Sequence, residues 1–334
     1  MTMATLNWLL VGAGDIAHKR VAPALAAAPG SALLGVCDPR AEAAREVAAQ
    51  HHAAEVYTDF AEALARTRAD AVYLATPIHL HAAHALQALQ AGKHVLVEKP
   101  LALSAPEGER VVKAAAASGT TAGCAYFRRL SPRYQYARDM LARGEFGRLV
   151  LMRMVYHSWF SPSADDAKYW RVVRARSGGG PLSDMGSHMF DVLIGLCGLP
   201  SRVIARCDNL VQKWDVEDTA SILLTMPDGA HLTASFSWST KTWRHEFEIV
   251  GTEAKLSWLP YDSGPVSQTK GRQSEQLDQP PAENVHLPLV EDFVQAVHAG
   301  RPPACPLAEA VKTNVLLDAV YRSAAEGYEV TLAA

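Results

Sequence analysis

The sequence predicts an α/β domain built on a doubly wound parallel sheet, followed by an α+β domain with a large, mostly antiparallel sheet. Over residues 1–125, apolar segments of strand length alternate with helical segments, which is typical of a parallel sheet. Over residues 126–334, several strand-like segments follow one another without helices between them, which indicates antiparallel pairing. A length of 334 residues exceeds one ordinary core and suits two domains. We also expect that the last helix can pack back on the first domain.

The composition is that of an ordinary globular protein, with 49% hydrophobic and 20% charged residues. The net charge of −3 gives no electrostatic reason to expect nucleic acid or an anionic membrane as a partner. No apolar run reaches the roughly 18 residues of a membrane-spanning helix, and the first residues lack the basic start of a signal peptide. The five cysteines are scattered without a CxxC pair. We therefore expect reduced thiols and a cytoplasmic protein.

Hydrophobic patterns and their punctuation predict the elements of the first domain. Residues 94–97 form the clearest strand, which must stop or turn at Pro100 because proline has no N–H for a sheet hydrogen bond. Gly92 suits the end of the preceding helix. The other expected strands cover residues 6–11, 32–37, 69–75 and 121–125. The first expected helix follows the glycine-rich turn and ends near residue 28, and the later helices cover residues 42–51, 60–66, 79–91 and 105–117.

The second domain is predicted to begin with a helix near residues 133–143 and a long strand at residues 149–160. A glycine run, Gly178-Gly179-Gly180, leads into a helix at about residues 183–197. Met226-Pro227-Asp228-Gly229 supplies a hairpin turn. Residues 261–282 are polar and contain Gly, Gln, Ser and Pro, so we expect a long mobile loop. Further strands are expected at residues 203–209, 219–226, 231–239, 245–250 and 254–258, and further helices at residues 290–299 and 307–326.

A glycine-rich turn stands between the first strand and the first helix, as a dinucleotide-binding Rossmann domain requires. Its residues are Gly12, Gly14, Asp15, Ile16 and Ala17. Gly12 permits a tight turn, Gly14 lets the backbone approach a pyrophosphate, and Ala17 lets the helix pack on the strand. The helix N-terminus offers N–H groups to phosphate. A plain strand-to-helix turn is the alternative.

The second strand ends in Asp38, which favours NAD as the cofactor. A carboxylate there can accept hydrogen bonds from both adenosine ribose hydroxyls and would repel a 2′-phosphate. Arg40, two residues later, could meet a 2′-phosphate instead. NADP is therefore the alternative cofactor.

Lys99 follows a strand at its carboxyl end, where open parallel sheets bind their ligands. We expect this side chain at the mouth of a cleft. A lysine in bulk water is the alternative.

Several segments together resemble the Gfo/Idh/MocA family, named for glucose–fructose oxidoreductase, inositol dehydrogenase and a rhizopine-catabolism protein. The matching segments cover almost the whole chain. They are residues 12–17, Ala75-Thr76-Pro77 with His81, Ala91-Gly92-Lys93-His94-Val95, Glu98-Lys99-Pro100, residues 178–188, Asp218-Thr219 and Gly251-Thr252-Glu253. The resemblance implies a nicotinamide-dependent oxidoreductase that acts on a sugar, cyclic polyol or related carbonyl compound. It also implies a homodimer or homotetramer paired through the open face of the second sheet.

The resemblance also implies site residues by position. Lys99, Asp184 and His188 match the family's catalytic set, and Tyr126 matches a segment that contacts nicotinamide or substrate. The family commonly has Asn at the place of Ile78, so any hydrogen bond from that side chain to the cofactor is absent. Besides the glycine-rich turn, Asp38 and Arg40, the expected cofactor residues are Thr76, Pro77, His81, Glu98, Lys99 and Arg128.

Asp184 and His188 have a spacing that suits proton transfer, because residues i and i+4 share one helix face. Oxidation of a secondary alcohol needs a base for the hydroxyl proton, and a histidine with an ordinary pKa near ~6.5 fits this role. Lys99 can stabilise the developing alkoxide or share the proton transfer. The alternatives are a plain N-cap for Asp184 and a satisfied interface histidine for His188.

On the substrate side we expect His157, Trp170 and Arg171. Aromatic faces suit stacking on a sugar ring, and arginine suits its hydroxyl groups. Packing in the core or at a subunit interface is the alternative.

A histidine cluster, His79-x-His81-x-x-His84, raises the question of a metal site. The first two histidines are poorly placed to share a metal from the first turn of one helix, and a metal site needs three or four ligands. We expect no metal.

Two other functions remain as alternatives. Some relatives keep NAD bound and use transient oxidation to cleave a glycosidic bond. Others bind the nucleotide in a regulatory, non-catalytic role, which does not require Lys99, Asp184 and His188 together.

Overall fold

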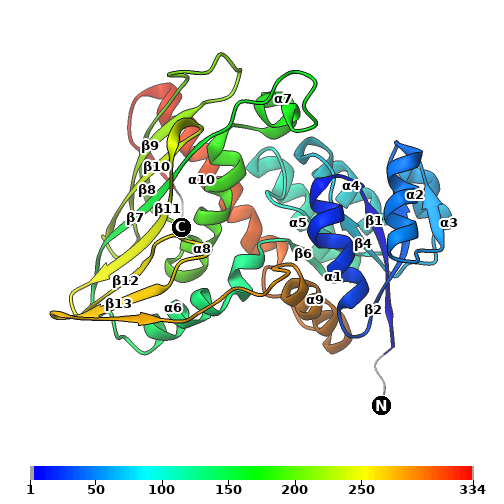
Figure 1. The fold of residues 1–334 in the computed structure, drawn as a ribbon, viewed down its shortest axis with the longest axis horizontal. Coiled ribbons are helices and arrows are strands. Elements are labelled where there is room, and N and C mark those ends of the chain that lie inside the picture. The colour runs from blue at the N-terminus through cyan, green and yellow to red at the C-terminus, as the bar shows by residue number, and fades with distance from the viewer. Residues whose placement is uncertain (1–3, 333–334) are drawn as a thin grey trace. The chain divides into compact units, whose positions relative to one another are not determined.

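The structure, a computed structural model, describes residues 4–332 of the chain, and its residues pack into two units. The first unit comprises Met1–Leu130 and Ala282–Val311, and the second comprises Ser131–Pro281 and Lys312–Ala334. Figure 1 shows the elements of both units. The expected boundary between residues 125 and 126 differs from this division, because Ala282–Val311 returns to the first unit. Its helix buries Phe293 against Trp8 in the first unit, with ring centroids 5.3 Å apart.

The first unit is built on a six-stranded sheet with the order β3-β2-β1-β4-β5-β6. Every neighbouring pair is parallel, so the predicted doubly wound parallel sheet is confirmed. Its strands are β1 (Leu6–Val11), β2 (Ser31–Cys37), β3 (Glu55–Tyr57), β4 (Ala71–Leu74), β5 (His94–Val97) and β6 (Ala122–Cys124). The short edge strand β3 was not expected, because its three residues carry no buried apolar side chain. Strand order reverses between β1 and β4, where such sheets bind ligands.

Helices cover both faces of this sheet. Trp8 and Leu10 of β1 enter one hydrophobic core, and Leu9 and Val11 enter the core on the other face. This double burial explains why the strands read as continuous apolar runs. The helical elements are η1 (Ala17–Val21, a π-helical turn), α1 (Ala22–Ala27), α2 (Ala41–Gln50), α3 (Phe60–Arg66), α4 (Ile78–Gln90), α5 (Ala105–Ser118), η2 (Phe127–Leu130) and α9 (Leu287–Ala299).

The second unit contains a nine-stranded sheet with the order β14-β13-β12-β11-β7-β10-β9-β8-β15. The pairing of β7 with β10 is parallel and the other neighbouring pairs are antiparallel, so a mostly antiparallel sheet is confirmed. Its strands are β7 (Leu149–Trp159), β8 (Arg202–Asp208), β9 (Thr219–Thr225), β10 (His231–Ser237), β11 (Ser239–Gly251), β12 (Ala254–Trp258), β13 (Val266–Lys270), β14 (Gln273–Leu277) and β15 (Val330–Thr331).

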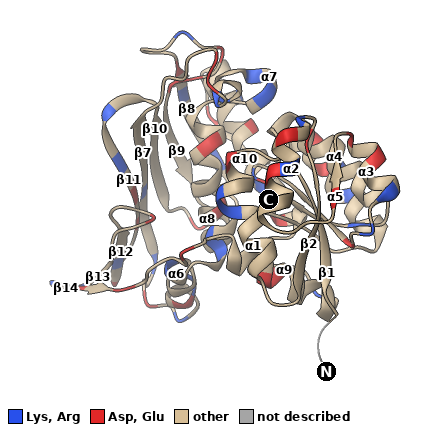
Figure 2. Cartoon of the chain, turned by 45° about the vertical axis from the view of Figure 1, so that its right-hand side comes forward, with Lys and Arg blue, Asp and Glu red and all other residues tan. Residues whose placement is uncertain are grey.

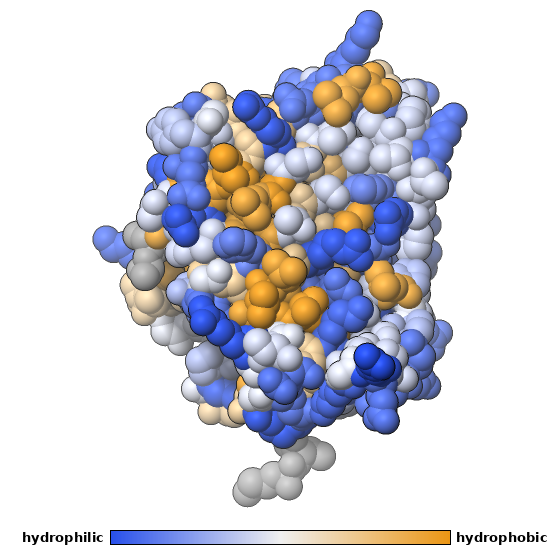
Figure 3. All heavy atoms as spheres, turned by 90° about the vertical axis from the view of Figure 1, so that its left-hand side faces the viewer, coloured by the Kyte–Doolittle hydropathy of each residue, from blue (hydrophilic) through white to orange (hydrophobic). Residues whose placement is uncertain are grey.

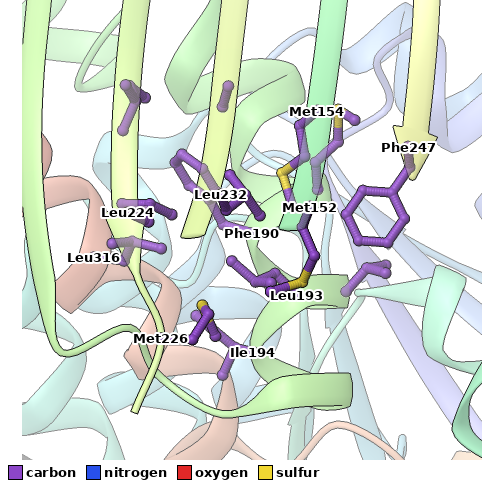
Figure 4. Close-up of a cluster of buried hydrophobic side chains, with 14 of the residues drawn as sticks. Met152, Met154, Phe190, Leu193, Ile194, Leu224, Met226, Leu232, Phe247 and Leu316 are labelled. Carbon is purple, nitrogen blue, oxygen red and sulfur yellow. The ribbon is translucent and has the colours of Figure 1, made fainter. Parts of the chain in front are cut away.

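One face of this sheet packs on helices and forms the core of the second unit. Figure 4 shows Met152 and Met154 of β7 against Phe190 and Leu193 of a helix. The helical elements of the second unit, in chain order, are α6 (Pro132–Ala142), η3 (Tyr169–Val172), α7 (Arg174–Ser177), η4 (Leu182–Gly186, a π-helical turn), α8 (Ser187–Cys197) and α10 (Leu307–Glu326). The first residues of α10, up to Val311, belong to the first unit.

The prediction of a long mobile loop at residues 261–282 is wrong over much of this range. Residues 266–277 form the hairpin of β13 and β14, which turns at Gly271 with φ of 59°. Val266 and Tyr261 are buried in the core of the second unit. The polar sequence concealed these strands because β14 is the exposed edge strand and β13 buries only Val266 and Gln268.

Acidic and basic residues both occur along the helices and strands of the two units (Figure 2), in keeping with a net charge of −3. Within residues 4–332, no helix is long and apolar enough to cross a membrane.

Candidate active site

The strand register places the predicted cofactor residues at one edge of the first sheet. Val11 pairs with Cys37 and with Leu74. Leu74 pairs in turn with Val97, which pairs with Cys124. Because parallel strands end at the same edge, the residues that follow these positions share that edge. They are Gly12, Asp38, Ala75-Thr76, Glu98-Lys99 and Ala125-Tyr126.

The glycine-rich turn needs its glycines for two different reasons. Gly12 has φ of 99°, and a Cβ atom there would lie 2.6 Å from the carbonyl oxygen of Ala75, so a side chain is excluded. A Cβ atom at Gly14 would meet no heavy atom within 4 Å. The turn is therefore open beside Gly14, where a pyrophosphate needs access to the backbone. Ala17 is fully buried against the core, as expected.

The side chains of Asp15 and Ile16 are engaged within the first unit. Asp15 pairs with Lys19 at 2.7 Å on the exposed side of the helix. Ile16 is half-buried and packs on the hydrophobic core. Their backbone N–H groups are therefore the candidates for contact with a phosphate.

Asp38 is buried at the end of β2 and joins the glycine-rich turn to Arg40. Its Oδ2 accepts the N–H of Ala13 at 2.8 Å, and its Oδ1 accepts the N–H of Arg40 at 2.9 Å. Burial alone would raise the pKa of Asp38, but the hydrogen bonds from Arg40 and Ala13 outweigh it and hold the pKa below its usual range. Asp38 is thus an ionised acceptor beside the turn.

His81 links the segments that follow β4 and β5. Its two ring nitrogens each lie 2.8 Å from a backbone carbonyl oxygen, one of Thr76 and one of Pro100. The ring is buried, so His81 orders the cofactor edge through backbone carbonyls. The Oγ1 of Thr76 is buried and has no hydrogen-bond partner within residues 4–332. That hydroxyl is a candidate donor to a bound cofactor.

The histidine cluster offers no preformed metal site. His81 uses both ring nitrogens, and His84 packs on Phe60 with ring centroids 4.6 Å apart. In the part of the chain that the structure describes, no group of three or more His, Cys, Asp or Glu side chains could hold a metal ion.

Pro77 directly precedes α4, and Ile78 is buried at the start of this helix.

Glu98 and Lys99 follow β5 directly. Glu98 is buried, whereas Lys99 is half-buried, and the Lys99 N–H donates to Glu98 Oε2 at 3.2 Å. Arg128 is also buried, with its guanidinium 4.7 Å from the ring centroid of Phe127. Tyr126, expected near substrate, is 1% exposed and packs in the core of the first unit.

Asp184 and His188 lie one turn apart where η4 continues into α8. The π-helical form of η4 is typical of functional sites. The N-cap alternative for Asp184 is wrong, because the cap position is Pro181 and Asp184 Oδ2 accepts from Arg171 Nη1 at 2.9 Å. His188 is 6% exposed. The second unit therefore brings together Asp184, His188 and Arg171.

Trp170 and His157 have different positions in the second unit. Trp170 is half-buried beside Arg171, whose guanidinium lies 5.6 Å from its ring centroid. His157 is three residues after Met154 on β7, so the two side chains point to opposite faces of the sheet, and Met154 enters the core. The Nε2 of His157 lies 2.9 Å from Ser235 Oγ. It thus lies on the sheet face opposite α8. The structure does not bring His157 to Asp184 and His188.

Glu217 is a residue of this site that the sequence did not reveal. Its Oε1 accepts the N–H groups of Gly180 at 2.9 Å and Leu182 at 3.3 Å, and the hydroxyl of Tyr321 at 3.0 Å. The buried carboxylate therefore holds the glycine run that leads to Asp184. A Cβ atom at Gly180 would lie 2.0 Å from the carbonyl oxygen of Glu217, which explains the glycine there.

Comparison with known proteins identifies the family. Residues 6–126 match the model of the oxidoreductase family with an NAD-binding Rossmann fold, and residues 134–257 match the GFO/IDH/MocA C-terminal domain. The chain belongs to the Gfo/Idh/MocA oxidoreductase family. Its first unit is the NAD-binding Rossmann domain, so the resemblance noted in the sequence and the predicted NAD cofactor are confirmed.

Relatives match this Gfo/Idh/MocA protein over nearly its whole length. The 1,5-anhydro-D-fructose reductase of Ensifer adhaerens is 28% identical over 96% of this chain and 97% of its own. The solved aldose-aldose oxidoreductase of Caulobacter crescentus, complexed with glycerol, has a TM-score of 0.90 and 24% identity, over 98% and 100% of the two chains. Levoglucosan dehydrogenase, solved with NADH and levoglucosan, has a TM-score of 0.89 and 23% identity, over 98% and 99%. These two structures show the same fold.

The residues of the first unit fit NAD. The open side of Gly14 admits a pyrophosphate, and Asp38 is an ionised acceptor for ribose hydroxyls. The partnerless hydroxyl of Thr76 lies at the same edge.

Proposed function

We propose that this oxidoreductase transfers a hydride between nicotinamide and a secondary alcohol or carbonyl of a sugar or cyclic polyol. The observation that carries the proposal is that Gly12, Asp38 and Lys99 lie at the same edge of the first sheet. The glycine-rich turn and the amine of Lys99 therefore belong to one edge. The whole-length match to 1,5-anhydro-D-fructose reductase supports a sugar-like substrate.

We assign roles in the chemical step to three side chains. Bound NAD supplies the hydride acceptor. His188 takes the hydroxyl proton as the general base. Lys99 donates a hydrogen bond to the substrate oxygen and stabilises its developing negative charge. Asp184 Oδ2 accepts a hydrogen bond from Arg171 Nη1 at 2.9 Å. This bond holds the helical segment that carries both Asp184 and His188.

The test is the near-ultraviolet absorbance of the purified protein with added NAD and a panel of inositols and aldoses. Growth of the reduced-nicotinamide band with one of them supports the proposal, and its loss in Lys99→Ala assigns the activity to this site. A flat trace from protein that still binds NAD contradicts net oxidation. Release of an aglycone from a glycoside panel by such protein would then favour glycosidic cleavage, and no release would favour a regulatory binding role.

The outer face of the second sheet supports a homodimer or homotetramer. Figure 3 shows apolar patches on this side of the molecule. Ile204 and Leu223 pair across β8 and β9 and are 42% and 40% exposed, on the face opposite the core. Leu151 of β7 is 53% exposed. Exposed apolar residues grouped on a sheet favour association, and a second copy presents the same surface.

We also propose a cytoplasmic location. All five cysteines are free thiols, which suits a reducing compartment. Burial raises the pKa of Cys37, Cys197 and Cys207 to about 12, so these thiols are poor nucleophiles.

A further inference from the structure

Glu98 is a buried carboxylate that accepts hydrogen bonds from three donors. Its Oε1 accepts the hydroxyl of Tyr73 at 2.7 Å and Nε2 of His286 at 3.1 Å. Its Oε2 accepts the backbone N–H of Lys99 at 3.2 Å. A buried carboxylate is costly unless such donors satisfy it. Burial alone would raise the pKa of Glu98, but the bonds from His286 and Tyr73 outweigh it and keep the pKa below its usual range.

His286 reaches Glu98 from a segment 188 residues further along the chain. It is 1% exposed and immediately precedes α9. Asn284 Oδ1 accepts the N–H of His286 at 3.0 Å, and Asn284 Nδ2 donates to the carbonyl oxygen of Arg20 at 2.8 Å. The ring of Phe127 lies 5.2 Å away between centroids. The imidazole is thus fixed between the η1 segment, η2 and the end of β5.

Nε2 is the ring nitrogen of His286 that faces Glu98 Oε1. Nδ1 is buried and has no hydrogen-bond partner within residues 4–332. The contact between His286 and Glu98 is therefore made through Nε2.

We infer that His286 is a positioning residue for Lys99. It holds the Glu98 carboxylate in the orientation that receives the Lys99 N–H, and so fixes the backbone from which the Lys99 side chain projects. This inference rests on the proposed function, in which Lys99 acts on the substrate oxygen. Small displacements of a catalytic group lower rates strongly.

Two substitutions separate positioning from simple loss of a histidine. His286→Gln places an amide N–H near the position of Nε2, whereas His286→Asn places the same group near Nδ1, one methylene short of Glu98. We expect His286→Asn to lower kcat at least tenfold and His286→Gln to stay within threefold of the parent. NAD affinity should stay within threefold in both variants, because the glycine-rich turn and Asp38 are unchanged.

A second readout needs neither substrate nor NAD. Hydrogen–deuterium exchange of the Lys99 amide, measured on peptides that differ by this residue, should accelerate at least tenfold in His286→Asn and not in His286→Gln. Equal kcat in both variants, or unchanged exchange in His286→Asn, would overturn the inference. Lys99→Ala in the same assay separates the two proposals. Turnover that survives Lys99→Ala contradicts the proposed function, whereas turnover lost in Lys99→Ala but kept in His286→Asn contradicts only the role of His286.

Discussion

Arg40 engages both carboxylate oxygens of Asp38. Its Nε donates to Oδ1 at 2.9 Å and its Nη2 to Oδ2 at 3.0 Å, while its side chain is 64% exposed. The same two oxygens accept the N–H groups of Arg40 and Ala13. A carboxylate accepts about four hydrogen bonds, so this set is full. We therefore expect ribose hydroxyls to reach Asp38 only when the exposed Arg40 side chain moves aside.

The first prediction concerns cofactor choice. Asp38→Ala should weaken NAD at least tenfold and NADP less, because the ribose acceptor is lost while Arg40 is released to meet a 2′-phosphate. A hydrogen bond to a charged group contributes about 1.5–3 kcal/mol, which is on the order of 10–100-fold in affinity. Fluorescence titration with NADH and NADPH measures both affinities.

Arg40→Ala is the matched control for this pair. It should weaken NADPH and leave NADH within threefold, because Asp38 keeps its bond from Ala13 and gains free lone pairs. A larger loss for NADPH than for NADH in Asp38→Ala contradicts the assignment.

The second prediction concerns the chemical step. Lys99→Ala and His188→Ala should each lower turnover at least a hundredfold and leave NAD affinity within a few fold. Loss of an acid–base group typically costs ~10²–10⁴-fold. Steady-state kinetics with the substrate found in the panel gives kcat. His157→Ala is the control and should retain kcat within a few fold, since His157 lies on the opposite sheet face. Full turnover in both test variants would refute the assignment.

The fold was largely predictable because burial leaves a periodic record in the sequence. β1, β4 and β5 are covered on both faces and appear as apolar runs, and β9 alternates between buried and exposed residues. The hairpin of β13 and β14 was missed because β14 buries none of its side chains fully. A strand whose stability depends on edge pairing leaves little hydrophobic signal.

The candidate site was predictable where residues adjoin strand ends. Gly12, Asp38 and Lys99 each follow a buried strand, so parallel pairing alone gathers them. Partners distant in sequence were not predictable. Glu217 reaches Gly180 across 37 residues and His286 reaches Glu98 across 188. Glu217 directly precedes Asp218-Thr219, a segment of the family resemblance, but nothing in that segment indicates a partner at Gly180.

The third prediction concerns association through the sheet face. Leu223→Asp should convert the proposed homo-oligomer to a monomer, because a charge would be placed beside Ile204 in the apolar patch. Light scattering after size-exclusion chromatography measures the mass. Leu210→Asp is the control, since Leu210 is 68% exposed in the loop after β8 and lies outside the strands. A parent protein that is already monomeric contradicts the prediction, as does an oligomer that survives Leu223→Asp.

The fourth prediction concerns the pH dependence of stability through Glu217. Burial raises the pKa of this carboxyl despite its bonds from Gly180, Tyr321 and Leu182. The folded chain therefore holds the proton more tightly than the unfolded chain, whose Glu pKa is about 4.3. As pH rises from that value to the raised folded pKa, the unfolded chain releases its proton first. The contribution of Glu217 to the free energy of unfolding falls over this interval and stays low above it.

Glu217→Gln removes this titration and keeps an amide oxygen for the N–H of Gly180. Its thermal midpoint relative to the parent should therefore rise as pH increases from 4 to 7. Glu217→Ala is the contrasting variant, because it leaves the N–H groups of Gly180 and Leu182 without their acceptor. It should be less stable than Glu217→Gln at every pH and should lower kcat, since the turn before Asp184 loses its anchor. Scanning calorimetry across this pH range measures the midpoints. A constant difference between parent and Glu217→Gln would show that the carboxyl has the same pKa in the folded and unfolded chains, contrary to the effect of its burial.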